Sequence, residues 1–255
     1  MGSSLQTTIR DLHRRRGRER RGLALAEGVR LVEEALAAGI PLRGAAVSPA
    51  LEATTRGKAL KSALLAAGVR LERIAEPELD ALADTEHPQG VVAVIEPRPW
   101  KLDDIAVGPG AALLVLDGVQ DPGNVGAMLR TALGLGAAGA VTLKGTAELT
   151  NPKVLRGSMG AIFHLPAVAA GSEEFLEWAG KRQLEVWVAA TDGETIGRRP
   201  AGPVGLVLGN EGAGVSPGLE AAARRRVAIP LARGVESLNV AVAAGILLYE
   251  VTRVD

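Results

Sequence analysis

A chain of 255 residues, of which 47% are hydrophobic, is long enough for one large or two modest hydrophobic cores, and this composition argues against an intrinsically disordered protein. The chain has no cysteine, which excludes disulfides, thiolate metal sites and cysteine nucleophiles and is typical of a reducing compartment. Its three histidines are far apart and follow no metal-ligand spacing, so a metalloenzyme is not expected. Without a signal-peptide-like start or an apolar run of about 20 residues, the sequence predicts a cytoplasmic protein with no contact with a membrane.

Charge is unevenly distributed, although the formal net charge is zero. Seven arginines crowd residues 10–21 against only Asp11 and Glu19, so this N-terminal arm is strongly basic. Phosphate is a natural partner for such an arm, and the alternative is a solvated, arginine-rich helix face. Because aromatic residues make up only 2% of the chain, base stacking on aromatic rings is not expected as the main mode of RNA contact. The residues expected to bind RNA phosphates here are Arg10, Arg14, Arg15 and Arg16.

Short apolar runs and helical patterns take turns along the first part of the chain. Strands are expected at 23–28, 42–47, 69–75 and 91–97, and helices at 28–39, 57–68 and 77–84. This alternation predicts a small α/β module. Pro97, Pro99, Pro109 and Gly110 then interrupt regular structure. We therefore predict an N-terminal domain over 1–97, a linker over 98–111 and a second domain over 112–255.

The second domain continues the alternation with strands rich in valine and leucine. Strands are expected at 111–118, 140–143, 167–170, 186–191, 205–209 and 226–231, and helices at 128–135, 173–183 and 237–252. Buried strands separated by helices predict a mostly parallel sheet that is covered on both faces. Ligands bind such sheets outside the carboxyl ends of the strands. The last helix is apolar nearly all round, which predicts that it is buried in the core or at a subunit interface.

Three glycine- and asparagine-rich segments lie beside these strands. They are PGNVGAMLRTA (122–132), LVLGNEGAGVSP (206–217) and IPLARGVESLNVAVA (229–243). Glycines that allow close backbone approach, together with polar side chains near a core, predict a ligand site built from loops. A further segment, GLGAAG (134–139), has the spacing of a dinucleotide fingerprint but follows a helix and precedes a strand, so we interpret it as a helix stop and turn. The GNEGAG loop lacks the lysine and hydroxyl of a phosphate-binding P-loop.

The three segments resemble motifs 1, 2 and 3 of the SpoU/TrmH family of RNA ribose 2'-O-methyltransferases, in the SPOUT superfamily. The matching residues are Asn124, Gly126 and Arg130 in motif 1, Gly209, Asn210, Glu211, Gly212 and Gly214 in motif 2, and Ile229, Pro230, Gly234, Ser237, Leu238 and Asn239 in motif 3. RGSMGAIFHLP from Arg156 also resembles the family. More loosely, AEGVRLVEEAL resembles the ribosomal-protein-like α/β module with which many members hold RNA.

The resemblance implies an α/β fold with a deep trefoil knot in the C-terminal parallel-sheet domain. It further implies S-adenosyl-L-methionine as cofactor, no metal, and an active site completed across a homodimer. The residues that match cofactor-contacting positions are Gly209, Ile229 and Leu238, although Ile229 and Leu238 are also plausible plain core residues. The expected reaction is methylation of a ribose 2'-hydroxyl in RNA, with ribosomal RNA as the expected substrate.

Positioning of the ribose and removal of its hydroxyl proton are the two tasks of this reaction. The resemblance gives Arg130 the central role. Because a guanidinium keeps its proton to about pH 12 or above, our hypothesis is that Arg130 binds the substrate phosphate and hydroxyl and lowers the pKa of the hydroxyl. Asn124 would then orient Arg130 or the ribose.

The remaining candidates each have a structural alternative. Glu211 is expected to orient the partner's arginine or the cofactor, or else to cap backbone amides. Ser237 is predicted to cap the last helix, which would leave Asn239 for the site. Arg156 is expected to bind an RNA phosphate or to form a surface salt bridge. The residue two positions after Asn239, a serine in the family, is Ala241 here.

Other functions compete with this prediction. One is ribose methylation of tRNA. Another is a non-catalytic RNA-binding or resistance-type protein on the same scaffold, against which the complete polar set of the motifs argues. The third is a dinucleotide oxidoreductase, which the position of GLGAAG disfavours.

Overall fold

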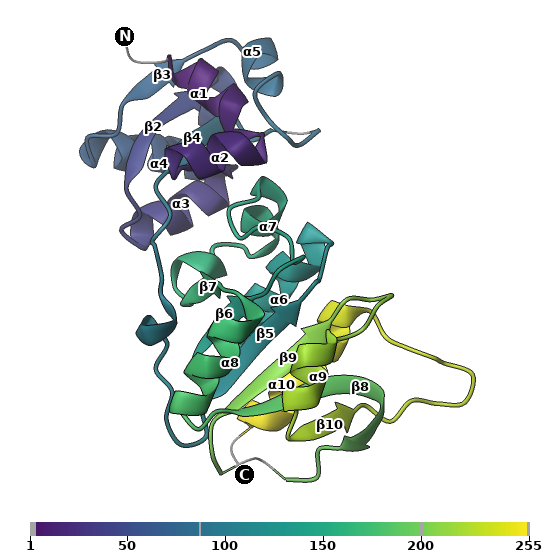
Figure 1. Cartoon of the computed structure of the whole chain (residues 1–255). Coiled ribbons are helices and arrows are strands. Elements are labelled where there is room, and N and C mark those ends of the chain that lie inside the picture. Colours follow the sequence, from purple (N-terminus) through teal and green to yellow (C-terminus); the bar gives the residue numbers. More distant parts are fainter. Residues whose placement is uncertain (1–3, 87, 199–200, 254–255) are drawn as a thin grey trace. The chain divides into compact units, whose positions relative to one another are not determined.

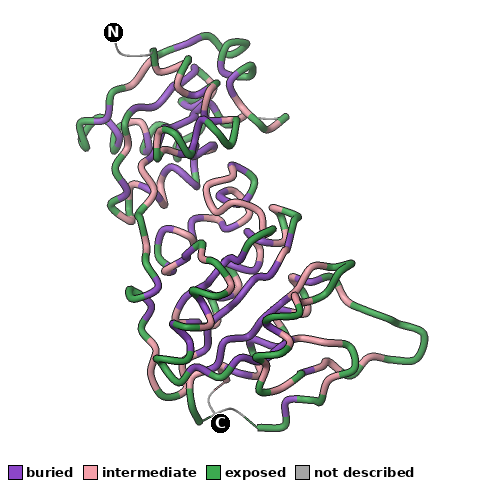
Figure 2. Tube along the Cα trace, viewed as in Figure 1, coloured by how far each residue is buried: buried purple, intermediate pink, exposed green. Residues whose placement is uncertain are grey.

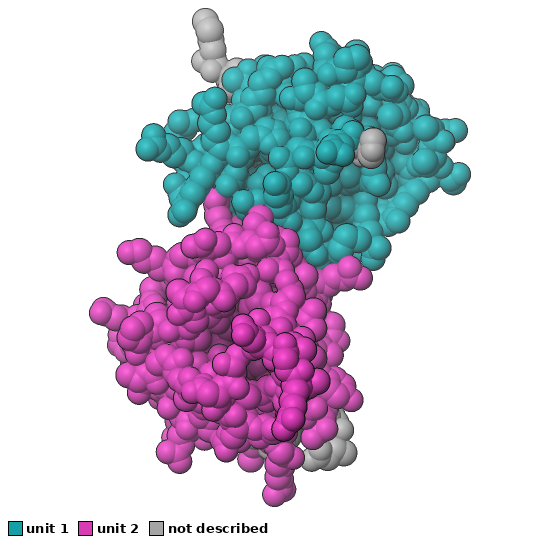
Figure 3. All heavy atoms as spheres, turned by 90° about the vertical axis from the view of Figure 1, so that its right-hand side faces the viewer, with its two compact units in different colours: residues 1–99, 150–163 teal, residues 100–149, 164–255 magenta. Residues whose placement is uncertain are grey.

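The computed structural model describes residues 4–86, 88–198 and 201–253. The chain divides into two compact units (Figure 3). The N-terminal unit comprises Met1–Pro99 and Thr150–Phe163, and the C-terminal unit comprises Trp100–Leu149 and His164–Asp255. The sequence had assigned all of 112–255 to one domain, whereas Thr150–Phe163 packs with the N-terminal unit. No helix in the described part of the chain is long and apolar enough to cross a membrane.

The N-terminal unit is built on a four-stranded mixed sheet with the order β1-β4-β2-β3. Its strands are β1 (Ala24–Glu27), β2 (Leu42–Val47), β3 (Leu71–Arg73) and β4 (Val91–Ile95). Its helices are α1 (Leu5–Leu12), α2 (Arg15–Arg21), α3 (Val29–Ala37), α4 (Thr55–Ala66), α5 (Glu76–Asp80) and α7 (Pro152–Gly157), with short 3-10 turns at Pro49–Ala53 and Ala161–Phe163. Strand β4 is antiparallel to β1 and β2, and β2 is parallel to β3. The predicted alternation of strands and helices is therefore present in this unit.

Apolar side chains fill both faces of this sheet. On one face, α1 and α5 contribute Ile9, Leu12 and Leu79 to a core with β4. On the other, α3 and α4 form a core that also receives Leu155 and Phe163 from the 150–163 segment. Burial of these two side chains explains why that segment belongs to the N-terminal unit.

The predicted basic arm is a pair of folded helices. Residues Ile9 and Leu12 of α1 are fully buried. Arg18 is also buried, and its Nη1 donates to the carbonyl oxygens of Leu12 at 2.9 Å and His13 at 3.0 Å. Hydrogen bonds from Arg21, and then from Arg20, hold the pKa of Asp11 below its usual value. Much of the arm's positive charge therefore has partners within the protein.

Of the arginines expected to bind RNA, Arg10, Arg14 and Arg16 are exposed, and Arg15 pairs with Glu19 at 2.7 Å. The phosphate contacts predicted for these arginines stay a prediction, and the arginine-rich helix face, which was the alternative interpretation of the sequence, describes α2. The reason is local, because Ser4 caps α1 and Gly22, with φ +64°, ends α2.

The C-terminal unit is built on a six-stranded sheet with the order β10-β8-β9-β5-β6-β7, and every neighbouring pair is parallel. Its strands are β5 (Ala112–Asp117), β6 (Gly139–Thr142), β7 (Ala167–Ala169), β8 (Glu185–Thr195), β9 (Val204–Gly209) and β10 (Arg225–Ala228). Its helices are α6 (Pro122–Gly134), α8 (Ser172–Lys181), α9 (Pro217–Ala222) and α10 (Val240–Thr252), with a 3-10 turn at Leu102–Asp104. The predicted parallel sheet is confirmed (Figure 1).

Helices cover both faces of this sheet. Helices α8 and α9 share a core with β5, in which Phe175 is fully buried. Helices α6 and α10 pack on each other, and α10 also packs on β5 and β9. The central strands β5 and β9 are buried except for Gly209 at the end of β9 (Figure 2), as expected for a sheet covered on both sides.

The strand order reverses at β5. From β5 the chain proceeds through β6 to β7 on one side, and it then returns to build β8, β9 and β10 on the other. Strands β5 and β9 are neighbours, and their carboxyl ends, Asp117 and Gly209, are register partners. Ligands bind open parallel sheets at such switch points. The segments that follow these two strands are the first and second motif segments.

Candidate active site

The first motif segment lies within a helix rather than in a loop. Helix α6 begins at Pro122, and the Asp121 carboxylate caps it by accepting the backbone N–H of Asn124 at 2.7 Å. The sequence prediction, which began this helix near Met128, is corrected. Aspartate followed by proline is the usual signal of a helix start and was available in the sequence. Asn124 is consequently held on the first turn of α6.

The second segment is a tight loop that one side chain organises from within. Asn210 Oδ1 accepts the backbone N–H groups of Gly212 at 2.9 Å and Ala213 at 2.8 Å, and its Nδ2 donates to the Gly118 carbonyl at 3.0 Å. The loop is thereby tied to the end of β5. The buried Asp117 carboxylate adds a second tie by accepting the backbone N–H of Ser216 at 2.6 Å. Sequence reasoning gave neither Asn210 nor Asp117 this bracing role.

Gly209, at the end of β9, must be a glycine because the backbone of the following loop leaves no room for a side chain. A Cβ atom at Gly209 would lie 2.4 Å from the carbonyl carbon of Gly214 and 2.5 Å from the amide nitrogen of Val215. The close approach that needs a glycine at position 209 is therefore to the loop backbone of Gly214 and Val215, and contact of Gly209 with the cofactor stays a prediction. Gly212 differs, since its Cβ would meet only Asn210 Oδ1, at 3.6 Å.

The third segment ends in the cap of α10, and the capping residue is not the predicted one. Asn239 is the N-cap, and its Oδ1 accepts the backbone N–H groups of Ala241 at 3.0 Å and Val242 at 3.3 Å. The prediction that Ser237 caps this helix is wrong, because α10 begins at Val240 rather than at Ser237. Ser237 lies exposed in the preceding loop.

Three polar side chains join the three segments. Asn239 Nδ2 donates to Asn124 Oδ1 at 3.1 Å, and Asn124 Nδ2 donates to Glu211 Oε1 at 3.0 Å. Asn239 therefore caps its helix with its oxygen and reaches Asn124 with its nitrogen. A chain of amides that ends on a carboxylate polarises each member toward the next. The sequence predicted each of these residues for the site, and the structure brings them together.

Arg130 stands apart from this amide chain. It is exposed on α6, and within the described part of the chain its side chain makes no hydrogen bond or ion pair. Its neighbour on the same face of the helix is Leu133, three residues on, which is 37% exposed. The catalytic set predicted from sequence is therefore split within one chain: Asn124, Glu211 and Asn239 meet, whereas Arg130 and Ser237 do not join them.

The segment between β10 and α10 has the backbone groups to hold a polar ligand. Over 229–238 the described backbone makes one hydrogen bond to another described backbone group, from Val235 N–H to the Ala232 carbonyl. Ile229 and Leu238, at its two ends, are half-buried. Free backbone donors and acceptors beside apolar side chains suit an adenine ring and a methionine chain. These residues therefore fit the implied S-adenosylmethionine.

Arg156 lies in the N-terminal unit with partners of its own. Its Nη2 donates to Asp84 Oδ2 at 2.7 Å, and its Nη1 lies 3.5 Å from Glu27 Oε2. The salt-bridge alternative describes this residue, and the phosphate contact predicted for it stays a prediction. Sequence reasoning missed Glu27, a strand carboxylate that is only 6% exposed.

Comparison with known proteins matches most of the chain to two domain models. Residues 111–249 match the model of the SpoU rRNA Methylase family, and residues 7–93 match an MRM3-like substrate binding domain. The chain belongs to the SpoU rRNA methylase family.

Similar relatives within the SpoU family span nearly the whole chain. A 23S rRNA (guanosine(2553)-2'-O)-methyltransferase of Bacillus subtilis is 34% identical, over 93% of this chain and 92% of its own. A 23S rRNA (uridine(2479)-2'-O)-methyltransferase of Streptomyces viridochromogenes is 33% identical, over 95% and 86%.

Two solved structures match with a TM-score of 0.85. The SpoU methyltransferase AviRb from Streptomyces viridochromogenes, in complex with AdoMet, is 31% identical over 98% of this chain and 97% of its own. An AdoMet-bound rRNA methyltransferase from Sinorhizobium meliloti is 30% identical over 98% and 95%. The α/β fold with a parallel sheet, predicted from the resemblance, is that of these enzymes.

Proposed function

We propose that this SpoU protein transfers a methyl group from S-adenosylmethionine to the 2'-hydroxyl of a ribose in ribosomal RNA. The observation that carries the proposal is the hydrogen-bonded chain Asn239–Asn124–Glu211, which joins three segments at the switch point of the sheet. A scaffold that only binds RNA has no need of this chain of two amides and a carboxylate, in which Asn124 is half-buried and Asn239 and Glu211 are exposed. Relatives of similar length carry the names of ribose 2'-O-methyltransferases.

The cofactor supplies a methyl group on a positively charged sulfur. The backbone of 229–238 would hold it, with Ile229 and Leu238 packing on its apolar surfaces and the Gly209 turn closing one side. Asn124, fixed by Glu211 and Asn239, would orient the ribose so that its oxygen approaches the methyl group in line. Arg130 would lower the pKa of the hydroxyl and bind a neighbouring phosphate. Ser237, exposed beside Asn239, would contact the RNA strand.

The position of Arg130 supports an active site shared by two chains. Arg130 and Leu133 lie on one face of α6, and α6 packs on α10. On α10, Val242 is 52%, Ile246 39% and Tyr249 54% exposed. Their spacing of four and three residues makes one apolar stripe along the helix. If this stripe is buried in a homodimer, Arg130 would lie close to the partner's Asn124, because α6 and α10 pack on each other on one face of the sheet.

Substitution of Ile246 by glutamate should separate this dimer. A charge in the centre of an apolar interface is expected to raise the dissociation constant by roughly 30-fold or more, and methyl transfer should fall with it. Light scattering after size-exclusion chromatography measures the mass directly. Leu65, 56% exposed on α4, provides the control, since Leu65→Glu adds the same charge away from the stripe. A dimer that survives Ile246→Glu unchanged would contradict this interface.

Ribosomal RNA is the proposed substrate class, and the nucleotide is a separate question. Relatives with 34%, 33% and 36% identity are named for a guanosine, a uridine and an adenosine of 23S rRNA. Because these relatives are named for three different bases, their similarity to this chain does not assign the nucleotide. A cytoplasmic location agrees with this substrate. The trefoil knot implied by the family stays a prediction, because strand order and register do not define how a chain passes through itself.

Mass mapping of ribose methylation tests the function. Ribosomal RNA from cells that lack the protein should miss one 2'-O-methyl group, and the purified protein with S-adenosylmethionine should restore it. Calorimetric titration measures cofactor binding separately. If the protein bound RNA but no S-adenosylmethionine, the non-catalytic scaffold would be favoured. If the protein methylated tRNA and no ribosomal RNA, the substrate class would be tRNA.

A further inference from the structure

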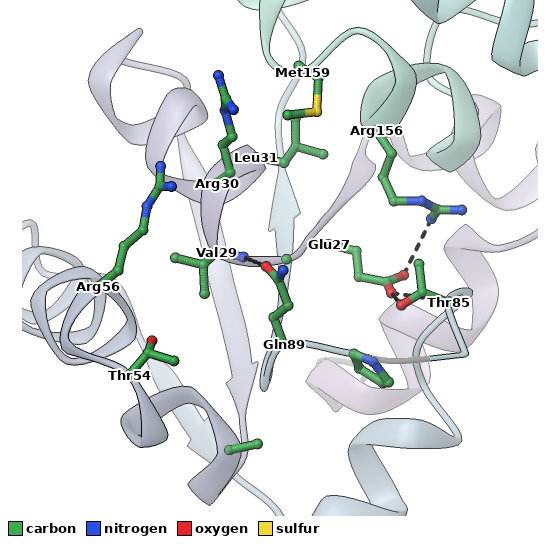
Figure 4. Close-up of a pocket in the computed structure, with 13 residues that line it drawn as sticks. Glu27, Val29, Arg30, Leu31, Thr54, Arg56, Thr85, Gln89, Arg156 and Met159 are labelled. Carbon is green, nitrogen blue, oxygen red and sulfur yellow. Dashed lines mark hydrogen bonds and ion pairs between the residues drawn. The ribbon is translucent and has the colours of Figure 1, made fainter.

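A cavity of about 610 Å³ lies within the N-terminal unit, around the start of α3 (Figure 4). Its size is that of pockets that hold a ligand as large as one nucleotide. It is separate from the site in the C-terminal unit described above, because all of its lining residues belong to the N-terminal unit.

Apolar side chains form part of the lining. Val29 and Leu31, on the first turn of α3, are largely buried in the protein and contribute to the wall. Met159 lies opposite, with its thioether toward Leu31 in Figure 4. A flexible, polarisable thioether packs well on an aromatic ring. This surface suits a nucleobase, which a purely basic patch would not.

Positive charge surrounds the apolar surface. Arg30, Arg56 and Arg156 all line the cavity, against one lining carboxylate, that of Glu27. Arg156 is engaged with Glu27 and Asp84, and Arg56 pairs with Glu33. Arg30 is exposed and has no ion pair among the described residues. The Arg56 side chain is 58% exposed despite its pair, against 24% for Arg156, so Arg30 and Arg56 are the guanidinium groups best placed for the phosphates of an RNA strand.

Polar contacts around the buried Glu27 and at the start of α3 hold the cavity in shape. The Glu27 carboxylate accepts the backbone N–H groups of Asp84 at 2.8 Å and Thr85 at 3.2 Å, together with the Thr85 hydroxyl. Gln89 Oε1 accepts the backbone N–H of Val29 at 2.9 Å. Arg156 closes this arrangement through its contact with Glu27 (Figure 4). A binding site whose walls are fixed by such contacts loses little entropy when it is filled.

The cavity depends on a distant part of the chain. Arg156 and Met159 come from the 150–163 segment, which lies between β6 and β7 in sequence. The first 97 residues alone would lack this wall. The N-terminal unit therefore has a complete cavity only when the whole chain is folded.

We propose that this cavity binds one unstacked nucleotide of the RNA substrate. The base lies against Val29, Leu31 and Met159, and the adjoining phosphates face Arg30 and Arg56. Sequence-specific proteins commonly recognise RNA through such splayed bases in single-stranded loops. The proposal rests on RNA being the substrate, as proposed above, and it gives the N-terminal unit a defined contact with that RNA.

Fluorescence anisotropy with two RNA probes tests the proposal on the full chain. One probe is a fluorescein-labelled single-stranded RNA of 12 nucleotides of mixed sequence, and the other is a hairpin with a fully paired stem closed by a rigid loop of stacked bases. Removing both guanidinium groups in Arg30→Ala/Arg56→Ala should weaken binding of the single strand about 10-fold and reduce the salt slope by about 1.4. The matched control is Arg70→Ala/Arg43→Ala, which removes two exposed arginines outside the cavity, one of them paired with a glutamate. The control should bind as the unchanged protein does.

A second variant fills the cavity without changing charge. Ala50→Trp, at a lining position, should also weaken binding of the single strand and should leave the hairpin unaffected. Thermal unfolding and S-adenosylmethionine titration, which reports on the C-terminal unit, show whether each variant is folded. Three results would each overturn the nucleotide site. One is an equal loss of RNA affinity in the two double variants, and another is an equal loss of affinity for both probes. The third is full affinity for the single strand in a folded Ala50→Trp variant.

The same measurements separate this proposal from the proposed function. If the unchanged protein neither bound S-adenosylmethionine nor methylated RNA, the function would fail. If it methylated RNA while Arg30→Ala/Arg56→Ala matched its control, only the nucleotide site would fail.

Discussion

Replacement of Arg130 by alanine is expected to lower the rate of methyl transfer by about 100- to 1,000-fold, the usual effect of removing one group that stabilises a developing oxyanion. Binding of S-adenosylmethionine should be retained, because Arg130 is exposed and separate from the 229–238 segment. Single-turnover assays with saturating cofactor measure the rate. Arg130→Lys keeps the charge and removes the planar fork, so retained activity with an unchanged pH profile would rule out a need for that fork.

Mixed dimers decide whether Arg130 acts in its own chain or in its partner's site. One protomer carries Arg130→Ala and the other carries Asn124→Ala, and two affinity tags isolate the mixed pair. If the site is shared, one of the two sites combines an intact Asn124 with the partner's intact Arg130, and about half the normal activity returns. If Arg130 acts within its own chain, both sites lack an essential group and the mixed dimer stays inactive. The second outcome would contradict the shared site.

The sequence predicted the centre of the sheet well because β5 and β9 consist mostly of valine and leucine. Runs such as ALLVLD at 112–117 have no polar face, and only a strand covered on both sides satisfies that pattern. For the arginine-rich arm the sequence left a phosphate-binding segment and a helix face as alternatives. In the structure Leu5, Ile9 and Leu12 of α1 lie four and three residues apart on one helix face, and Ile9 and Leu12 are fully buried. Arginines dominate the composition of this stretch, whereas the burial of Ile9 and Leu12 holds α1 on the N-terminal unit.

The wrong predictions in the candidate site concern the residues at which α6 and α10 begin. Ser237 and Asn239 are both good caps, and local sequence does not choose between them. The bond from Asn239 to Asn124, 115 residues earlier in the chain, is a tertiary contact that no local pattern contains. The position of the 150–163 segment has the same origin, because Leu155 and Phe163 complete a core whose other members lie before residue 96. Motif resemblance selected Asn124, Glu211 and Asn239, which meet in the structure, and only the fold assigned their partners.

Replacement of Gly209 by alanine should damage the second motif segment through sterics alone. The new methyl group would lie 2.4 Å from the backbone of Gly214, and neither strand β9 nor the loop held by Asn210 can move away easily. Overpacking of this kind costs about 1–3 kcal/mol, or roughly 2–12 °C in Tm for a unit of this size. Affinity for S-adenosylmethionine should fall about 10-fold or more, because the loop would shift at the end of β9.

Gly212→Ala is the matched control in the same loop. Its added methyl group would meet only Asn210 Oδ1, at 3.6 Å, an ordinary contact distance. We expect its free energy of unfolding to stay within about 1 kcal/mol of that of the unchanged protein, and its affinity for S-adenosylmethionine to stay within about twofold. Thermal unfolding and calorimetric titration of both variants separate the two glycines. If Gly209→Ala behaved like Gly212→Ala, the close approach of the β9 end to Gly214 would not control the cofactor site, and the loop would have to be more adaptable than its hydrogen bonds indicate.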